Sequence, residues 1–201
     1  ALGIENASDS LYAKSKLKGE EEINKNFNKS VILRPSIVYS VDDNFTTQFM
    51  TMLSLLPIFP LYYKGLTRFR PIFCKDLAHS ISEIILRDID ENIIEFIGPE
   101  EMTLKEIIEK LLDSINKKRL LIPLPILVAK ITTRIFEFLP KPLITMDQLR
   151  LLKYDNIPSG KFKTNFDLSL DANSKFIDEI NKYSYMWKEE GEYSKKNLNK
   201  L

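Results

Sequence analysis

Tyr12 and Lys16 lie four positions apart in the stretch SLYAKSKLKGEE, residues 10–21, whose pattern predicts a helix. Residues i and i+4 share one face of an α-helix, so both side chains can point into one site. A free tyrosine has a pKa near ~10, and a neighbouring ammonium favours the phenolate. At about 5 Å and an effective dielectric of about 20, the charge contributes roughly 3 kcal/mol, or about two pKa units before desolvation. Tyr12 would then be able to donate or accept a proton near neutral pH.

This spacing has little specificity by itself. The chain has 8 tyrosines and 29 lysine plus arginine residues, so one such pair is expected by chance. The competing interpretation of Tyr12 and Lys16 is a surface pair on a polar helix.

Length and composition narrow the class of protein. With 201 residues, 44% of them hydrophobic, the chain can bury a core, as one domain or as a domain with a small appendage. The net charge of +1 gives no large field of either sign, which argues against dedicated nucleic-acid binding. One cysteine, Cys74, and one histidine, His79, exclude an internal disulfide framework and a conventional zinc site, so we expect no metal and a reducing compartment.

Helical and apolar segments alternate along the chain. Asp76 is predicted to cap the helix that follows it, with an ion pair to Arg34 as the alternative, and Thr103 with Glu106 forms a capping-box pattern. The predicted strands or extended segments are 31–33, 67–73, 92–98 and 119–125. The predicted helices are 10–21, 44–57, 75–88, 103–116, 124–139, 145–156 and 172–190.

The segment 120–139 is apolar but carries Lys130, Arg134 and Glu137 on one helical face. Pro123 and Pro125 break the run, so no transmembrane segment is predicted. Two interpretations stay open: an amphipathic helix packed on the core, or a helix that docks on a membrane surface or a partner.

Several segments in this order carry a family resemblance: Tyr-x-x-x-Lys, then VILRPSIVYS, TRFRPIFCKDLAHSI, EFIGPEEMTLKEII and LLIPLPILVAKI. Together they resemble the short-chain dehydrogenase/reductase superfamily. Within it the chain is similar to the extended or atypical NAD-dependent epimerase/dehydratase branch, the group that includes the nucleotide-binding accessory subunit of respiratory complex I.

The resemblance implies site residues and a cofactor. Tyr12 would be the catalytic acid/base, and Lys16 would lower its pKa and bind the nicotinamide ribose. Pro35, Ser36 and Ile37 would contact the cofactor, which is NAD or NADP. The serine or threonine that completes the family's catalytic set is expected before or at Ala1.

The six glycines nowhere form the phosphate-binding pattern G-x-G-x-x-G after a strand. The resemblance therefore implies a chain that is only the C-terminal part of a Rossmann-type doubly wound parallel sheet, with α/β architecture and a small, mostly helical substrate or cap region. We expect sheet and substrate segments over 1–118, a helical cap over 119–190 and a frayed tail over 191–201. Alone, such a chain would bind a dinucleotide weakly or not at all.

Two functions follow from the resemblance. In the first, the intact protein is an NAD(P)-dependent oxidoreductase or epimerase that exchanges a hydride at a hydroxyl or keto carbon of a small-molecule substrate, with Tyr12 and Lys16 as the proton-transfer pair. In the second, it is a non-catalytic dinucleotide-binding scaffold or assembly subunit of respiratory complex I, docked through 124–139. A self-standing interaction module is a third hypothesis. The expected location is cytoplasmic, with peripheral contact to the inner membrane in the second case.

Overall fold

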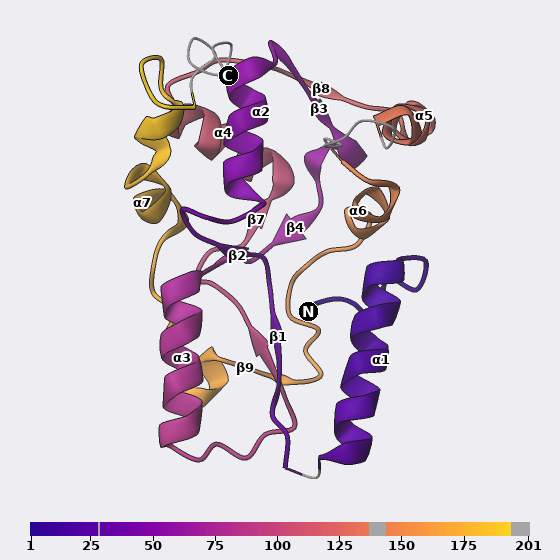
Figure 1. Cartoon of the computed structure of the whole chain (residues 1–201), viewed down its shortest axis with the longest axis vertical. Helices are drawn as coiled ribbons and strands as arrows, with labels where there is room; N and C mark the ends of the chain where they lie inside the picture. Colours follow the sequence, from indigo (N-terminus) through magenta and orange to yellow (C-terminus); the bar gives the residue numbers. More distant parts are fainter. Residues whose placement is uncertain (28, 137–143, 194–201) are drawn as a thin grey trace.

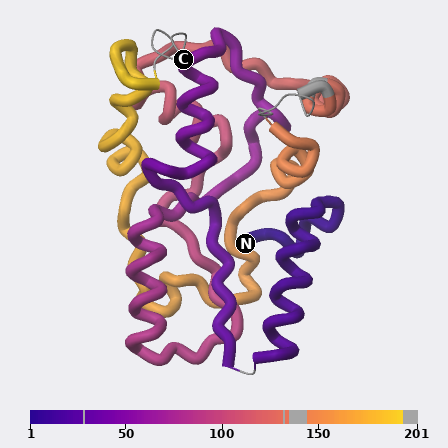
Figure 2. Tube along the Cα trace, viewed as in Figure 1, coloured from indigo at the N-terminus to yellow at the C-terminus, as the bar shows by residue number. Residues whose placement is uncertain are grey.

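The computed structural model describes residues 1–27, 29–136 and 144–193. Figure 1 shows two regions stacked along the long axis: a sheet flanked by two long helices, and a helical region above it. The chain passes between the regions several times, as the trace in Figure 2 makes clear.

A parallel three-stranded sheet with the order β1-β6-β9 forms the first region. Its strands are β1 (Ile32–Pro35), β6 (Ile93–Phe96) and β9 (Lys163–Thr164). Helices α1 (Leu11–Asn26) and α3 (Cys74–Leu86) lie on opposite sides of β1 in Figure 1. Strands β1 and β6 are short and mostly apolar, as expected of strands that helices cover, and each carries one charged residue, Arg34 and Glu95.

The second region is built on β3 (Ile58–Leu61), which pairs in parallel with β8 (Leu120–Pro123). The helices of this region are α2 (Thr46–Leu55), α4 (Leu104–Ser114), α5 (Ile126–Phe136), α6 (Met146–Leu151), α7 (Phe176–Asn181) and the short 3-10 helices η1 (Tyr62–Gly65) and η3 (Ser184–Trp187). Apolar side chains of α2, α4, α7 and η3 share the largest hydrophobic cluster. That cluster fixes α2, which borders the candidate site.

Two short strand pairs link the regions. β2 (Val38–Tyr39) pairs in parallel with β5 (Ile72–Phe73), and β4 (Arg68–Phe69) pairs antiparallel with β7 (Met102–Thr103). A further 3-10 turn, η2 (Phe166–Leu168), follows β9. The α/β class with parallel strands, predicted from the alternation of segments, is confirmed.

The predicted capping box is confirmed at the start of α4. The Thr103 hydroxyl accepts the N–H of Glu106 at 3.2 Å, and the Glu106 carboxylate accepts the N–H of Thr103 at 2.7 Å. These two bonds satisfy backbone donors that a helix start leaves unpaired. They also hold the pKa of Glu106 below its usual value, through the Thr103 backbone bond first.

Asp76 does not cap α3, so that prediction is wrong. The helix already begins at Cys74, and the Asp76 carboxylate instead accepts the N–H and the hydroxyl of Ser174, each at 2.9 Å. The alternative, an Arg34–Asp76 ion pair, is wrong as well, because Arg34 binds Glu5 and Glu20. Both errors have one cause: the true partners are remote in the sequence.

Two predicted elements are divided in the structure. The segment 67–73 forms two short strands, β4 and β5, because residues 70 and 71 interrupt the pairing and Pro71 has no N–H to donate. The predicted helix 172–190 is α7 followed by η3. The predicted boundary between 118 and 119 stays a prediction; β8 pairs with β3 across it, and β9 joins β6. Glu137 and residues 194–201 of the predicted tail lie outside the described residues.

Candidate functional site

The start of α1 is held by a carboxylate from α6. Asp147 accepts the N–H of Leu11 at 2.8 Å, the N–H of Tyr12 at 3.0 Å and the Ser10 hydroxyl at 2.9 Å. The Ser10 oxygen in turn accepts the N–H of Ala13 at 3.2 Å. Three orphan donors of the first turn are thus satisfied. The backbone of Tyr12 is therefore fixed by Asp147, which is not among the predicted site residues.

Two opposing effects act on the pKa of Asp147. Burial raises it, but the hydrogen bonds from the backbone of Tyr12 and Leu11 and from the Ser10 hydroxyl outweigh burial and lower the pKa below its ordinary value. The carboxylate therefore stays ionised at neutral pH, where its charge also favours the N-terminal end of the α1 dipole.

Tyr12 and Lys16 are neighbours on α1, as their spacing predicts. The Lys16 Nζ lies 5.5 Å from the centroid of the Tyr12 ring, within the range of a cation–π contact. The Tyr12 side chain is 45% exposed and lines a cavity, whereas Lys16 does not line it. The ammonium is thus placed over the ring face, and the proton-transfer roles of both residues stay predictions.

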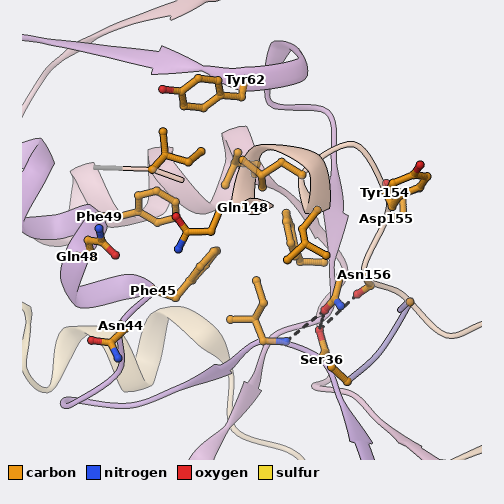
Figure 3. Close-up of a pocket in the computed structure, with 18 of the residues that line it drawn as sticks. Ser36, Asn44, Phe45, Gln48, Phe49, Tyr62, Gln148, Tyr154, Asp155 and Asn156 are labelled. Atoms are coloured by element: carbon orange, nitrogen blue, oxygen red, sulfur yellow. Dashed lines mark hydrogen bonds between the residues drawn. The ribbon is translucent and has the colours of Figure 1, made fainter. Parts of the chain in front are cut away.

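The cavity has a volume of about 790 Å³. The N-terminal segment, the end of β1, α2, β3 and α6 surround it, and Figure 3 shows the side chains that converge on it. Most of them are apolar. The polar or charged lining residues are Tyr12, Ser36, Asn44, Gln48, Tyr62, Gln148, Tyr154, Asp155 and Asn156.

The three predicted cofactor contacts, Pro35, Ser36 and Ile37, line the same cavity as Tyr12. They come directly at and after the carboxyl end of β1, where ligands bind in open α/β sheets. The structure therefore brings four of the five predicted site residues together at one cavity. The fifth, Lys16, contacts the Tyr12 ring but does not line the cavity.

Asn156 fixes this strand end. Its Oδ1 accepts the Ser36 hydroxyl at 2.6 Å and the N–H of Ile37 at 3.2 Å, and its Nδ2 donates to the carbonyl of Leu2 at 2.8 Å (Figure 3). The backbone of Asn156 also donates to the carbonyl of Arg68. One side chain thus joins the N-terminal segment and the end of β1. No local signal marks Asn156 in the sequence, because the partners of its side chain are 119 to 154 positions away.

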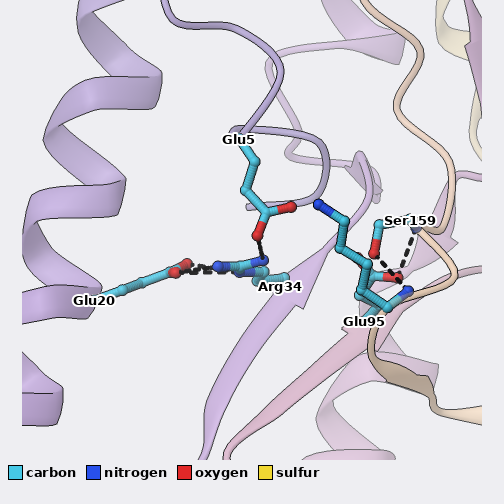
Figure 4. A network of polar contacts seen from close by, with 6 residues as sticks. Glu5, Glu20, Arg34, Glu95 and Ser159 are labelled. Carbon is cyan, nitrogen blue, oxygen red and sulfur yellow. Dashed lines mark hydrogen bonds and ion pairs between the residues drawn. The ribbon is translucent and has the colours of Figure 1, made fainter.

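A second polar network holds β1 to α1 and to the N-terminal segment (Figure 4). Arg34 is 4% exposed; its Nη2 lies 2.6 Å from a Glu20 oxygen and its Nη1 2.8 Å from a Glu5 oxygen. Burial alone would lower the pKa of Arg34, but the bonds to Glu20 and Glu5 raise it above its ordinary value. Glu95, buried on β6, accepts the N–H of Ser159 at 2.9 Å. Arg34 therefore joins α1 and the N-terminal segment to the sheet.

The other singled-out residues lie away from the cavity lining. Cys74 is half-buried at the start of α3, and His79 is exposed on the same helix. In the described part of the chain, no group of three or more His, Cys, Asp or Glu side chains could hold a metal ion. None of the helices over the described ranges has the length and apolar character needed to cross a bilayer.

Comparison with known sequences finds relatives among curated proteins. No protein-family profile matches the chain. It is 26% identical over 180 residues to NADH dehydrogenase (ubiquinone) 1 alpha subcomplex subunit 9, mitochondrial, of Arabidopsis thaliana, covering 84% of this chain and 45% of that protein. The subunit of the same name from Mus musculus is 25% identical over 154 residues, covering 75% and 40%. The chain thus spans less than half the length of these curated relatives.

Solved structures share the fold at low identity. The dTDP-glucose 4,6-dehydratase of Bacillus anthracis in complex with NAD matches with a TM-score of 0.59 at 13% identity, over 94% of this chain and 55% of that one. The UDP-glucose 4-epimerase of Thermus thermophilus with NAD matches with a TM-score of 0.58 at 16% identity, over 86% and 52%. The resemblance inferred from the sequence is therefore confirmed: the chain has the fold of NAD-dependent epimerases and dehydratases of the short-chain dehydrogenase/reductase type, and it is similar in sequence to a subunit of NADH dehydrogenase.

Proposed function

We propose that the protein carrying this chain is an NAD(P)-dependent oxidoreductase or epimerase-like enzyme that acts at a hydroxyl or keto carbon. One observation carries the proposal: Tyr12 and the strand-end residues Pro35, Ser36 and Ile37 line a single cavity. A tyrosine beside the carboxyl end of a parallel strand is placed to exchange a proton with a substrate oxygen.

The residues at this end of the cavity fit the nicotinamide end of a dinucleotide. When bound, that cofactor would supply or accept the hydride. The Ser36 hydroxyl and the Ile37 N–H are already bonded to Asn156, and Pro35 has no N–H. These three residues would therefore contact the nicotinamide ring by van der Waals packing rather than by hydrogen bonds. The NAD-bound structural neighbours support a cofactor of the NAD type.

Tyr12 would hold the moving proton. Its hydroxyl would donate to a keto oxygen or accept from a hydroxyl, while Lys16, over the ring, would stabilise the phenolate electrostatically. Asp147 would act indirectly, as a positioning residue that fixes the backbone of Tyr12.

Binding and turnover test this proposal in sequence. We expect NAD(H) or NADP(H) to bind, by calorimetry, to the protein extended upstream of Ala1, and more weakly or not at all to the 201-residue chain. In the extended protein, Tyr12→Phe should lower turnover of an aliphatic ketone by about 10²–10⁴-fold while dinucleotide affinity changes little. Tyr185→Phe, an exposed tyrosine on η3, is the matched control and should leave both unchanged. Full turnover by Tyr12→Phe would refute the catalytic role.

A second candidate is the non-catalytic scaffold, which two observations favour. The curated relatives are named as subunits of NADH dehydrogenase, and α5 leaves apolar side chains uncovered: Leu127 is 69% exposed, with Ile131 exposed one turn on and Lys130 beside it. In this case the protein would sit peripherally on a membrane-associated complex through α5.

Dinucleotide binding without turnover would favour the scaffold. Leu127→Glu should then abolish co-sedimentation with the respiratory complex, whereas Ile85→Glu, at an equally exposed apolar position on α3, should not. If neither variant changes co-sedimentation, α5 is not the docking surface.

A further inference from the structure

We propose that the cavity admits an uncharged, largely apolar molecule with one hydroxyl or keto oxygen, and that it rejects sugar nucleotides. The position of the reacting oxygen, next to Tyr12, rests on the proposed function; the class of ligand does not. It follows from three properties of the cavity: its charge, the state of the helix ends around it, and its apolar interior.

The cavity has almost no charge of its own. Lysine and arginine are absent from the lining residues of the described chain, and Asp155 is the sole acid among them. Asp155 is already paired with Arg68, accepting its N–H at 2.8 Å, its Nε at 2.9 Å and its Nη2 at 2.8 Å. A nucleoside diphosphate would bring two or more negative charges into this site, where no lysine or arginine side chain of the lining can receive them, which is unfavourable.

The helix ends that border the cavity are occupied as well. A free helix N-terminus would be an anion site. At the start of α2, however, the Asp43 carboxylate accepts the N–H groups of Phe45 at 2.6 Å and Thr47 at 3.4 Å. At the start of α1 the Asp147 carboxylate takes the same place. The protein's own carboxylates thus fill the positions where a phosphate would bind, and they would repel one.

The interior is aromatic and apolar. Phe45, Phe49 and Phe59 stack edge to face along one wall, with ring centroids 4.8 Å apart for the first pair and 5.8 Å for the second. Met52 adds a flexible side chain beside them. The volume of about 790 Å³ lies in the range of small-molecule sites. A chain or ring would therefore bury against these side chains, and its oxygen would remain at the polar end near Tyr12.

Methyl NMR on the protein labelled with [¹³C-methyl]methionine tests the proposal directly. The chain has five methionines; Met52 lines the cavity and Met186 on η3 does not. The probes are 2-octanone and UDP-glucose. We expect 2-octanone to shift the Met52 signal saturably, with a Kd on the order of 0.1–1 mM, and to leave Met186 unchanged. UDP-glucose at the same concentrations should shift neither signal.

A pair of variants separates the cavity from non-specific binding. Ile58 lines the cavity mouth and is 49% exposed, so Ile58→Trp can narrow the mouth without overfilling the core. We expect it to weaken 2-octanone binding by about tenfold or more. Ile85→Trp, on the exposed face of α3, is the control and should bind like the unchanged protein.

Three outcomes would overturn the inference: a Met52 shift with UDP-glucose, no Met52 shift with 2-octanone, or equal 2-octanone affinity in both variants. None of these readouts requires a dinucleotide or turnover. If 2-octanone and UDP-glucose do not behave as expected, Tyr12 can still exchange a proton with another substrate. If Tyr12→Phe keeps full activity, the proposed class of ligand is unaffected.

Discussion

The Asp147 carboxylate accepts a hydrogen bond at 3.0 Å from the backbone N–H of Tyr12, a residue 135 positions earlier in the chain. Through this bond α6 sets where α1 begins, and with it the place of the tyrosine at the cavity. Local helix propensity does not fix this relationship, because Tyr12 and Asp147 meet only when the chain folds.

Asp147→Asn should destabilise the protein by about 1–2 kcal/mol at pH 7, because the first turn of α1 loses a charged acceptor. Urea unfolding measures the loss. Asp171→Asn, at an exposed loop position, is the control and should stay within about 0.5 kcal/mol of the unchanged protein.

The contribution of Asp147 should also depend on pH. Its pKa is lower in the folded state than the ordinary 3.8, so its stabilisation is present above that value and is lost as the pH falls through the lower folded pKa. The difference between the unchanged protein and Asp147→Asn should therefore shrink between about pH 4 and pH 2. A difference that stays constant over this range would show that the ionised carboxylate is not what stabilises the helix start.

Asn156→Ala should cost about 2–3 kcal/mol of unfolding free energy, because three hydrogen bonds, to Ser36, Ile37 and Leu2, are lost at a partly buried site. Thermal and urea unfolding both report it. Asn26→Ala, at the exposed end of α1, should change stability by less than about 0.5 kcal/mol. Equal effects of the two substitutions would contradict the role assigned to Asn156.

Arg34→Met should cost about 3–5 kcal/mol, because two carboxylates, those of Glu5 and Glu20, are left without their buried partner. Adding Glu20→Gln should recover part of the loss, since it removes one of the unpaired charges. The comparison is Arg68→Met, which removes an exposed arginine from Asp155 and Glu101 and should cost at most about 1 kcal/mol. A double variant no more stable than Arg34→Met would argue against the charge explanation.

Gly98→Ala should be strongly destabilising, by about 2–4 kcal/mol, because a Cβ at that position would lie 1.8 Å from the carbonyl oxygen of Pro71. The backbone near Pro71 would have to move to make room for this Cβ. Gly19→Ala offers the opposite case: it lies within α1 with no atom within 4 Å of the added Cβ, and it should stabilise by about 0.5–1 kcal/mol. Chemical denaturation of both variants checks the pair, and a stable Gly98→Ala would refute the close approach.

The sequence alone determined the resemblance and most of the elements, although the segments 67–73 and 172–190 are each divided in the structure. Periodicity and capping predicted α4 down to its Thr103–Glu106 box, and the apolar runs predicted β1 and β6, because these signals are encoded within a few residues of each element. The order of motifs also indicated the fold that the structural neighbours share.

The tertiary structure decided what holds the site and what it can admit. The partners of Asp76, Arg34, Asn156 and Asp147 could not be predicted, since each pair meets across 14 to 154 positions and leaves no local pattern. The occupied helix ends and the absence of lysine and arginine from the described cavity lining belong to this level too. They depend on which side chains converge in space, and a carboxylate that fills an anion site is indistinguishable in the sequence from one on the surface.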